Sequence, residues 1–147
     1  MSSVSTYLNF PGNAEEAFTF YGRVFGTQLE GPVFRMGDVP MPDGMPPLAE
    51  QDKIKIMHMM LPILGGHCLM ASDMLESMGQ HTVIGNNTTI NLNIDTRAET
   101  DRLFEALSAG ATDCAPMSEQ FWGYWGCCLD RFGIRWMFNC AEGATSA

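Results

Sequence analysis

The histidines are the side chains of this sequence best suited to transfer a proton near neutral pH, and imidazole is also a common metal ligand. His58 lies in the middle of IKIMHMML, a strand-like stretch, whereas His67 follows two glycines and His81 lies in an irregular stretch. None of them shows the H-x-H or H-x-x-x-H spacing that brings two imidazoles to one metal ion. We therefore expect His58 either to bind or transfer a proton in a pocket or to be a hydrogen-bonded core histidine. For the other two we expect surface or turn roles.

The cysteines are five in number and contain no C-x-x-C pair; they are Cys68, Cys114, Cys127, Cys128 and Cys140. An odd count without a secretory signal argues against a disulfide framework and indicates the reducing cytoplasm. Most of these residues lie in apolar, strand-like surroundings, where a free cysteine acts as a small hydrophobe. The alternative is a reactive or oxidisable thiol at the adjacent Cys127 and Cys128.

Two further groups of residues, one aromatic and one rich in methionine, could bind a ligand without ionisable side chains. Phe121 to Gly126 reads FWGYWG, and Trp122 and Trp125 could stack on a planar ligand or pack in the core. Twelve methionines occur in 147 residues, and several cluster between residues 57 and 74, namely Met57, Met59, Met60, Met70 and Met74. Flexible thioethers suit an adaptable apolar pocket, although ordinary core filling is the simpler interpretation of any single methionine.

A repeated pattern predicts the elements that must position these side chains. In Tyr7 to Gly26 a short strand meets a Pro-Gly turn, Asn13 has the place of a helix N-cap, and Glu16 lies three residues later. Thr89 to Ala111 repeats this order, with Thr96 and Glu99 in the same relation and Gly110 at the expected helix end. One strand-helix unit thus occurs twice, which predicts two half-sized modules.

Strand-like stretches follow each helix, so both halves are expected to read β-α-β-β-β. They cover residues 28–36, 53–61 and 67–72 in the first half, and 112–117, 122–129 and 134–140 in the second. We expect one α+β domain over residues 1–147, with a first module at 4–72, a linker at 73–87 and a second module at 88–140. Residues 37–52 hold four of the eight prolines and are long enough to form a flap over a site.

Composition excludes several classes of protein. The chain is 46% apolar and 17% charged, as in a globular domain, and no apolar run is long enough to span a membrane. Its net charge of −9 argues against nucleic acids and anionic membranes as partners, because both attract basic patches. We expect a cytoplasmic protein.

Two segments carry a family resemblance. YLNFPGNAEEAFTFYGRVFG and FWGYWGCCLDRFGIRWMFNC resemble the PhnB-like branch of the vicinal oxygen chelate superfamily, which includes glyoxalase I, bleomycin-resistance proteins and extradiol dioxygenases. The resemblance runs from about Val4 to Cys140, and the Asp130-x-Phe132-Gly133 turn is among its specific parts. It implies two βαβββ modules whose mixed sheets curl around a cavity, and assembly as a homodimer.

The resemblance also implies four metal-ligand positions, one on the first and last strand of each module, filled by His, Glu or Gln in metal-dependent members. Here these positions match Thr6 or Tyr7, Met70, Thr89 and Met137, none of which is such a residue. A thioether is a poor ligand for a divalent ion, and shifting the alignment by one residue recovers no site. We therefore expect no metal at this place and identify no cofactor.

Strand alternation within the implied fold selects the side chains that face the cavity. They are Tyr7, Asn9, Met70 and Ser72 in the first module, and Thr89, Asn91, Asn93, Arg135, Met137 and Asn139 in the second, with Trp122 and Trp125 beside them. We expect a small organic ligand that is uncharged or weakly polar, with His58 as the candidate catalytic residue. Whether any reaction is catalysed stays open.

Two alternatives are kept. A metal-dependent lyase, isomerase or dioxygenase would need unrecognised ligands, such as His58 with a carboxylate from a flexible loop. The methyltransferase label that this branch has carried is disfavoured, because the glycine-rich loop expected for a nucleotide-like cofactor is missing and Gly12 alone is a turn residue.

Overall fold

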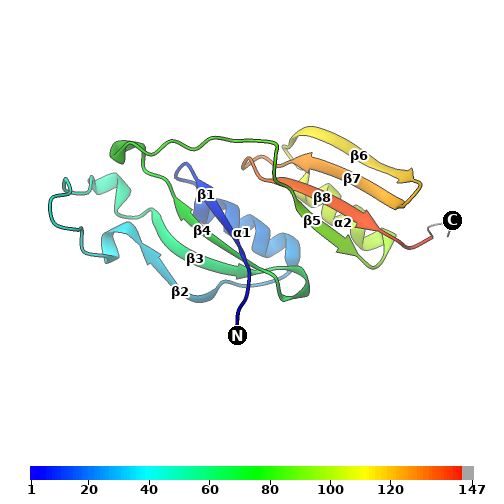
Figure 1. The fold of residues 1–147 in the computed structure, drawn as a ribbon, viewed down its shortest axis with the longest axis horizontal. Coiled ribbons are helices and arrows are strands. Elements are labelled where there is room, and N and C mark those ends of the chain that lie inside the picture. Colours follow the sequence, from blue (N-terminus) through cyan, green and yellow to red (C-terminus); the bar gives the residue numbers. More distant parts are fainter. Residues whose placement is uncertain (144–147) are drawn as a thin grey trace. The chain divides into compact units, whose positions relative to one another are not determined.

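The computed structural model describes residues 1–143, which fold as two compact units, Met1–Val83 and a second unit that begins at Ile84. Each unit contains a helix and a four-stranded mixed sheet (Figure 1). The predicted α+β class and the pair of βαβββ modules are therefore confirmed.

The first unit runs in the order β1 (Thr6–Phe10), α1 (Ala14–Phe25), β2 (Glu30–Arg35), β3 (Ile56–Pro62) and β4 (Cys68–Asp73). Its sheet has the strand order β1-β4-β3-β2, in which β1 is parallel to β4 and the other two pairs are antiparallel. The long connection between β2 and β3 contains only short 3-10 turns, at Met36–Asp38 and Glu50–Asp52, as its prolines predict.

The second unit repeats this order with β5 (Ile90–Ile94), α2 (Arg97–Leu107), β6 (Thr112–Gln120), β7 (Gly123–Leu129) and β8 (Arg135–Cys140). The strand order β5-β8-β7-β6 is the same, with β5 parallel to β8. All three tryptophans of the chain, Trp122, Trp125 and Trp136, belong to this unit.

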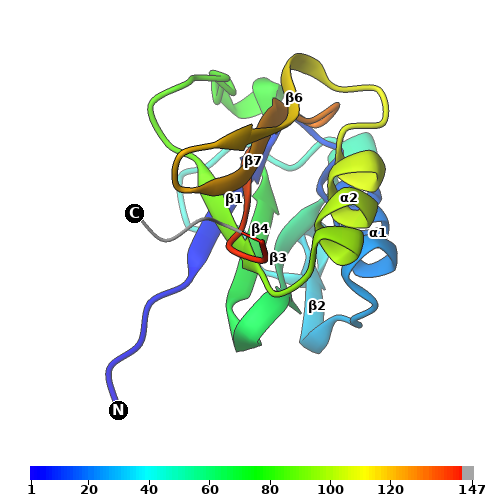
Figure 2. The same cartoon turned by 90° about the vertical axis from the view of Figure 1, so that its right-hand side faces the viewer.

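Each helix covers one side of its own sheet (Figure 2). In the first unit Phe18 and Tyr21 of α1 are buried together with Phe10, Leu61 and Leu69. In the second unit Leu103 and Leu107 of α2 are buried together with the inner strand residues Leu92, Trp136 and Phe138. Because strand side chains alternate, the other side of each sheet carries a different set of residues, which we call the open face of that unit.

The helix ends differ in part from the expected caps. Thr96 accepts a hydrogen bond from the Glu99 N–H at 3.2 Å, as predicted, and Gly26 ends α1 with a φ of 67°. Asn13, by contrast, makes no side-chain cap; the N–H of Ala14 instead donates to a carboxylate oxygen of Asp73 at 2.9 Å. The helix α2 ends at Leu107, three residues before Gly110.

Asp73 is the anchor that replaces the expected cap in the first unit. Its side chain is buried, and its second oxygen accepts the N–H of Ile56 at 2.8 Å. One carboxylate at the end of β4 therefore holds both the start of α1 and the start of β3. The partner residues lie 59 and 17 positions away in sequence, so this contact depends on the tertiary fold.

Candidate functional site

The open face of the second unit brings together most of the side chains predicted for it. Strand pairing sets Asn91 opposite Met137 and Asn93 opposite Asn139, and Trp125 lies opposite Asn139 on the other side of β8. Leu92, Trp136 and Phe138 point the other way and are buried, as alternation requires. Thr89 lies just before β5 and is half-buried.

Three asparagines form a line of amides on this face. The amide nitrogen of Asn91 donates to the Asn93 oxygen at 3.3 Å, and that of Asn139 donates to the Asn91 oxygen. Within residues 1–143, the Asn93 amide nitrogen and the Asn139 oxygen have no protein partner. The line therefore presents one donor and one acceptor to a bound molecule.

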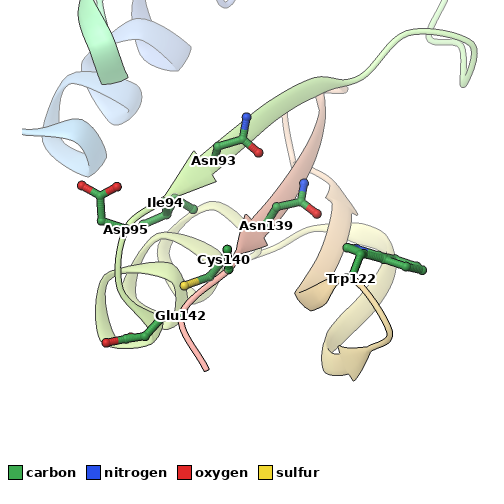
Figure 3. Close-up of a pocket in the computed structure, with 8 residues that line it drawn as sticks. Asn93, Ile94, Asp95, Trp122, Asn139, Cys140 and Glu142 are labelled. Carbon is green, nitrogen blue, oxygen red and sulfur yellow. The ribbon is translucent and has the colours of Figure 1, made fainter. Parts of the chain in front are cut away.

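A pocket of about 470 Å³ lies at the end of this line (Figure 3). The amides of Asn93 and Asn139 lie between Asp95, which follows β5, and Trp122, which precedes β7. Cys140 and the segment Ala141–Glu142 complete the wall. A pocket of this size can accommodate a small organic molecule.

Trp122 is the aromatic wall of the pocket. Its indole is 47% exposed and meets Trp125 edge-on at 6.3 Å between ring centroids. Phe121 packs against it at 4.6 Å but is itself 88% exposed and does not line the pocket. Phe121 and Trp122 of the FWGYWG segment are therefore not packed in the core, which was one of the two interpretations of this segment.

The charged groups of the pocket do not favour an anion. Glu142 accepts the Arg97 N–H at 2.6 Å, and the Arg97 guanidinium binds the Glu142 carbonyl at 3.0 Å and pairs with Glu119. That ion pair raises the pKa of Arg97 and lowers the pKa of Glu119, so both stay charged and engaged with each other. Asp95 adds a carboxylate with no protein partner in the described chain.

The two charged residues of the pocket wall, Asp95 and Glu142, were not in the predicted set, although the sequence carried a signal for one of them. Asp95 continues the alternation of Asn91 and Asn93 one step beyond β5, so strand periodicity could have included it. Glu142 lies after the last strand, where no periodic pattern applies.

The open face of the first unit gathers the remaining predicted residues. Tyr7 lies opposite Met70 and Asn9 opposite Ser72 in the β1–β4 pair. The Tyr7 hydroxyl is 3.3 Å from Nδ1 of His58, and their rings are 5.9 Å apart. His58 is half-buried on this face.

The other histidines and the cysteines differ in their surroundings. His67 Nε2 lies 2.8 Å from the Thr6 hydroxyl, and His81 is exposed. Burial raises the pKa of the Cys128 thiol to about 12, which makes it a poor nucleophile. Cys127 lies opposite Met137 on the open face and is half-buried.

No group of three or more His, Cys, Asp or Glu side chains in residues 1–143 is arranged to hold a metal ion. Likewise, none of the helices in that range is both long and apolar enough to cross a membrane.

Comparisons with known proteins agree with this architecture. A family model described as 3-demethylubiquinone-9 3-methyltransferase matches residues 2–138. Protein YjdN of Escherichia coli (strain K12) is 26% identical over 144 residues, covering 92% of this chain and 93% of YjdN. The crystal structure of protein PA1353 from Pseudomonas aeruginosa is 37% identical with a TM-score of 0.80, covering 95% of this chain and 98% of that one.

More distant structures show the same fold. The PhnB protein from Bacillus cereus is 21% identical with a TM-score of 0.73, covering 95% of this chain and 100% of its own. A glyoxylase/bleomycin resistance protein/dioxygenase domain from Frankia sp. EAN1pec is 17% identical with a TM-score of 0.62, covering 93% and 95%. The chain therefore belongs to the family of that model, and its fold is the one that the resemblance to the vicinal oxygen chelate superfamily implies.

Proposed function

We propose that the protein binds a small, uncharged, planar organic molecule in the pocket of the second unit, without a metal ion. The observation that carries the proposal is the line of amides that ends beside an exposed indole. A planar ligand would stack on Trp122 and exchange hydrogen bonds with Asn93 and Asn139. Asp95 disfavours an anion at the same place.

The positions that match the family's metal ligands support a metal-free site. Tyr7 and Met70 form a pair in the first sheet, and Met137 faces Asn91 in the second. The remaining matched position, Thr89, lies just before β5. A hydroxyl, a phenol and two thioethers do not fit a divalent ion, which prefers imidazole or carboxylate donors.

A charge series tests the ligand class. Ligand-observed NMR would compare benzamide, benzoate and benzylamine, which share a ring and differ in charge. We expect benzamide to bind and benzoate to bind more weakly, because the carboxylates at the pocket repel it. Addition of chelator or of Zn²⁺ or Ni²⁺ should leave benzamide binding unchanged, and metal analysis of the purified protein should find no stoichiometric ion.

Matched variants locate the site. Trp122→Leu keeps apolar bulk but removes the stacking surface, and we expect benzamide to bind about 2- to 12-fold more weakly, the equivalent of about 0.5–1.5 kcal/mol for an aromatic pair. Phe121→Leu, which changes the exposed neighbour, should have no effect. Equal binding by the Trp122 variant and the parent, or binding that a chelator abolishes, would contradict the proposal.

His58 and Tyr7 are the groups that we propose for any proton transfer. Their separation of 3.3 Å and their place on the open face support this role. The imidazole signals of His58 in ¹H–¹⁵N NMR spectra would move on addition of a ligand that reaches it and stay fixed otherwise. Titration with S-adenosylmethionine in the same experiment tests the family model's methyltransferase description, and we expect no response.

We also retain from the family resemblance the proposal that the chain forms a homodimer. Light scattering coupled to size-exclusion chromatography measures the mass directly. A mass of one chain at micromolar concentration would contradict it.

A further inference from the structure

A second cavity, of about 460 Å³, lies within the first unit. It is formed by the long connection between β2 and β3, by the start of β3, and by the segment that follows β4. Five methionines line it, namely Met36, Met41, Met45, Met57 and Met78. Val39, Pro40, Pro42, Leu48 and Leu75 supply most of the remaining wall.

The cavity contains no free charge. Among residues 1–143, Asp73 is the only ionisable one that lines it, and Asp73 is 4% exposed with both oxygens bound to the N–H groups of Ala14 and Ile56. None of the described lysines, arginines and histidines lines the cavity to neutralise an acidic ligand. A charged molecule would lose its hydration here without gaining a partner, so the cavity selects uncharged ligands.

Two polar groups remain for a ligand. Gln80 uses its carbonyl oxygen to accept the Leu75 N–H at 2.9 Å, which leaves its amide nitrogen as a donor. Ser72 contributes a hydroxyl. Neither group has another protein partner in the part of the chain that the structure describes. A ligand with one hydrogen-bond acceptor would match them.

The side chains of the cavity wall leave room and apolar surface for such a ligand instead of packing against one another. Met45 and Met57 are 48% and 41% exposed, so apolar surface is left in water that a ligand would cover. Met57 lies at an irregularity in the β2–β3 pairing, where the strand departs from regular alternation. Prolines fix the backbone of the connection, while the thioethers adapt to the shape of the ligand.

We propose that this cavity is a second binding site, which takes an uncharged, mainly apolar molecule with a single hydrogen-bond acceptor such as a ketone. Its volume is within the range of small-molecule sites. It shares no lining residue with the amide pocket, so the two proposals stand or fall separately.

Prodan, a neutral naphthalene fluorophore with one ketone, is the probe. Its emission moves to shorter wavelength and gains intensity in an apolar site, so a titration gives both affinity and stoichiometry. We expect saturable binding of one molecule per chain. The anionic dye 8-anilinonaphthalene-1-sulfonate should bind at least tenfold more weakly, because the cavity offers no cation.

Paired variants assign the binding to the cavity. Met57→Leu conserves volume and polarity and should leave the affinity within twofold, whereas Met57→Glu places a charge in the wall and should weaken it at least tenfold. Gln80→Glu keeps the acceptor for the Leu75 N–H but replaces the donor by a carboxylate oxygen, and should weaken prodan severalfold. Unchanged circular dichroism shows that each variant is folded.

The outcomes separate this site from the proposed function. Trp122→Leu should leave prodan binding unchanged while it weakens benzamide, and Met57→Glu should do the reverse. Absence of saturable prodan binding, or equal binding by the Glu and Leu variants at position 57, overturns the second site. Loss of prodan binding in the Trp122 variant also overturns it.

Discussion

Replacing Asp130 by Asn should destabilise the second unit although the side chain keeps its size and shape. Asp130 is 3% exposed and lies in the turn between β7 and β8. One of its oxygens accepts the N–H groups of Phe132 and Ile134 at 2.8 and 2.9 Å, and the other accepts the indole N–H of Trp136 at 2.8 Å. This carboxylate thus fixes the turn that sets the register of β8.

The expected cost follows from these contacts. An asparagine can keep its oxygen on the two backbone groups, but each of these hydrogen bonds loses its charge-assisted part, about 1 kcal/mol. Its amide nitrogen then faces the buried indole N–H of Trp136, which is left without an acceptor at a cost of about 1–3 kcal/mol. Burying a neutral amide is less unfavourable than burying a carboxylate, which offsets part of the loss. We expect the free energy of unfolding to fall by about 2–4 kcal/mol.

Urea denaturation followed by far-ultraviolet circular dichroism measures this change. Asp43→Asn, in the exposed connection between β2 and β3, is the matched control and should change the stability by less than about 0.5 kcal/mol. In a Trp136→Phe background the indole N–H is gone, so Asp130→Asn should cost about 1–3 kcal/mol less. An Asp130→Asn variant as stable as the parent, or the same loss of unfolding free energy in both backgrounds, would refute the reasoning.

Three further predictions concern buried groups. Asp73→Asn should lower the free energy of unfolding by about 1–3 kcal/mol in the same urea assay, because one of two buried backbone N–H groups loses its acceptor; a change below about 0.5 kcal/mol would contradict this. At about pH 8 iodoacetamide should alkylate the exposed Cys114 in the native protein and spare Cys128, whose pKa of about 12 leaves roughly one thiol in ten thousand ionised. Early alkylation of Cys128 would show that its burial is incomplete. Because the folded-state pKa of Cys128 is raised, the contribution of its neutral thiol to the free energy of unfolding should be intact below about pH 9 and should decline as the pH rises toward 12. Urea denaturation midpoints at several pH values measure this decline.

The fold could be predicted because the repeat and the strand alternation are local patterns. Alternating residues such as Asn91, Leu92 and Asn93 distinguish two sides of a strand from the sequence alone, and the structure buries the apolar one. The same periodicity located the amides of the second unit and placed Met137 and Asn139 beside them. These features depend on neighbours in the chain, which a sequence displays directly.

Other features depend on contacts between distant positions and could not be predicted in this way. The N-cap prediction at Asn13 was wrong because Asp73, the last residue of β4, supplies the acceptor instead. The irregular pairing at Met57 breaks the alternation of strand side chains. The apolar cavity is formed by the segment that precedes β3 in the chain together with the segment that follows β4. The proline-rich connection indicated a flap, but its sequence does not specify which surface it covers.

The placement of every indole in one half of the chain has a practical consequence for physical studies. Light at the red edge of the protein absorption spectrum excites only tryptophan, and every tryptophan follows Ile84. Tryptophan fluorescence therefore reports on the second half of the chain, whereas circular dichroism averages over both halves. Coincident melting curves from the two signals would indicate that the halves unfold cooperatively. Separate curves would give each half its own stability without the need to cut the chain or to attach a label.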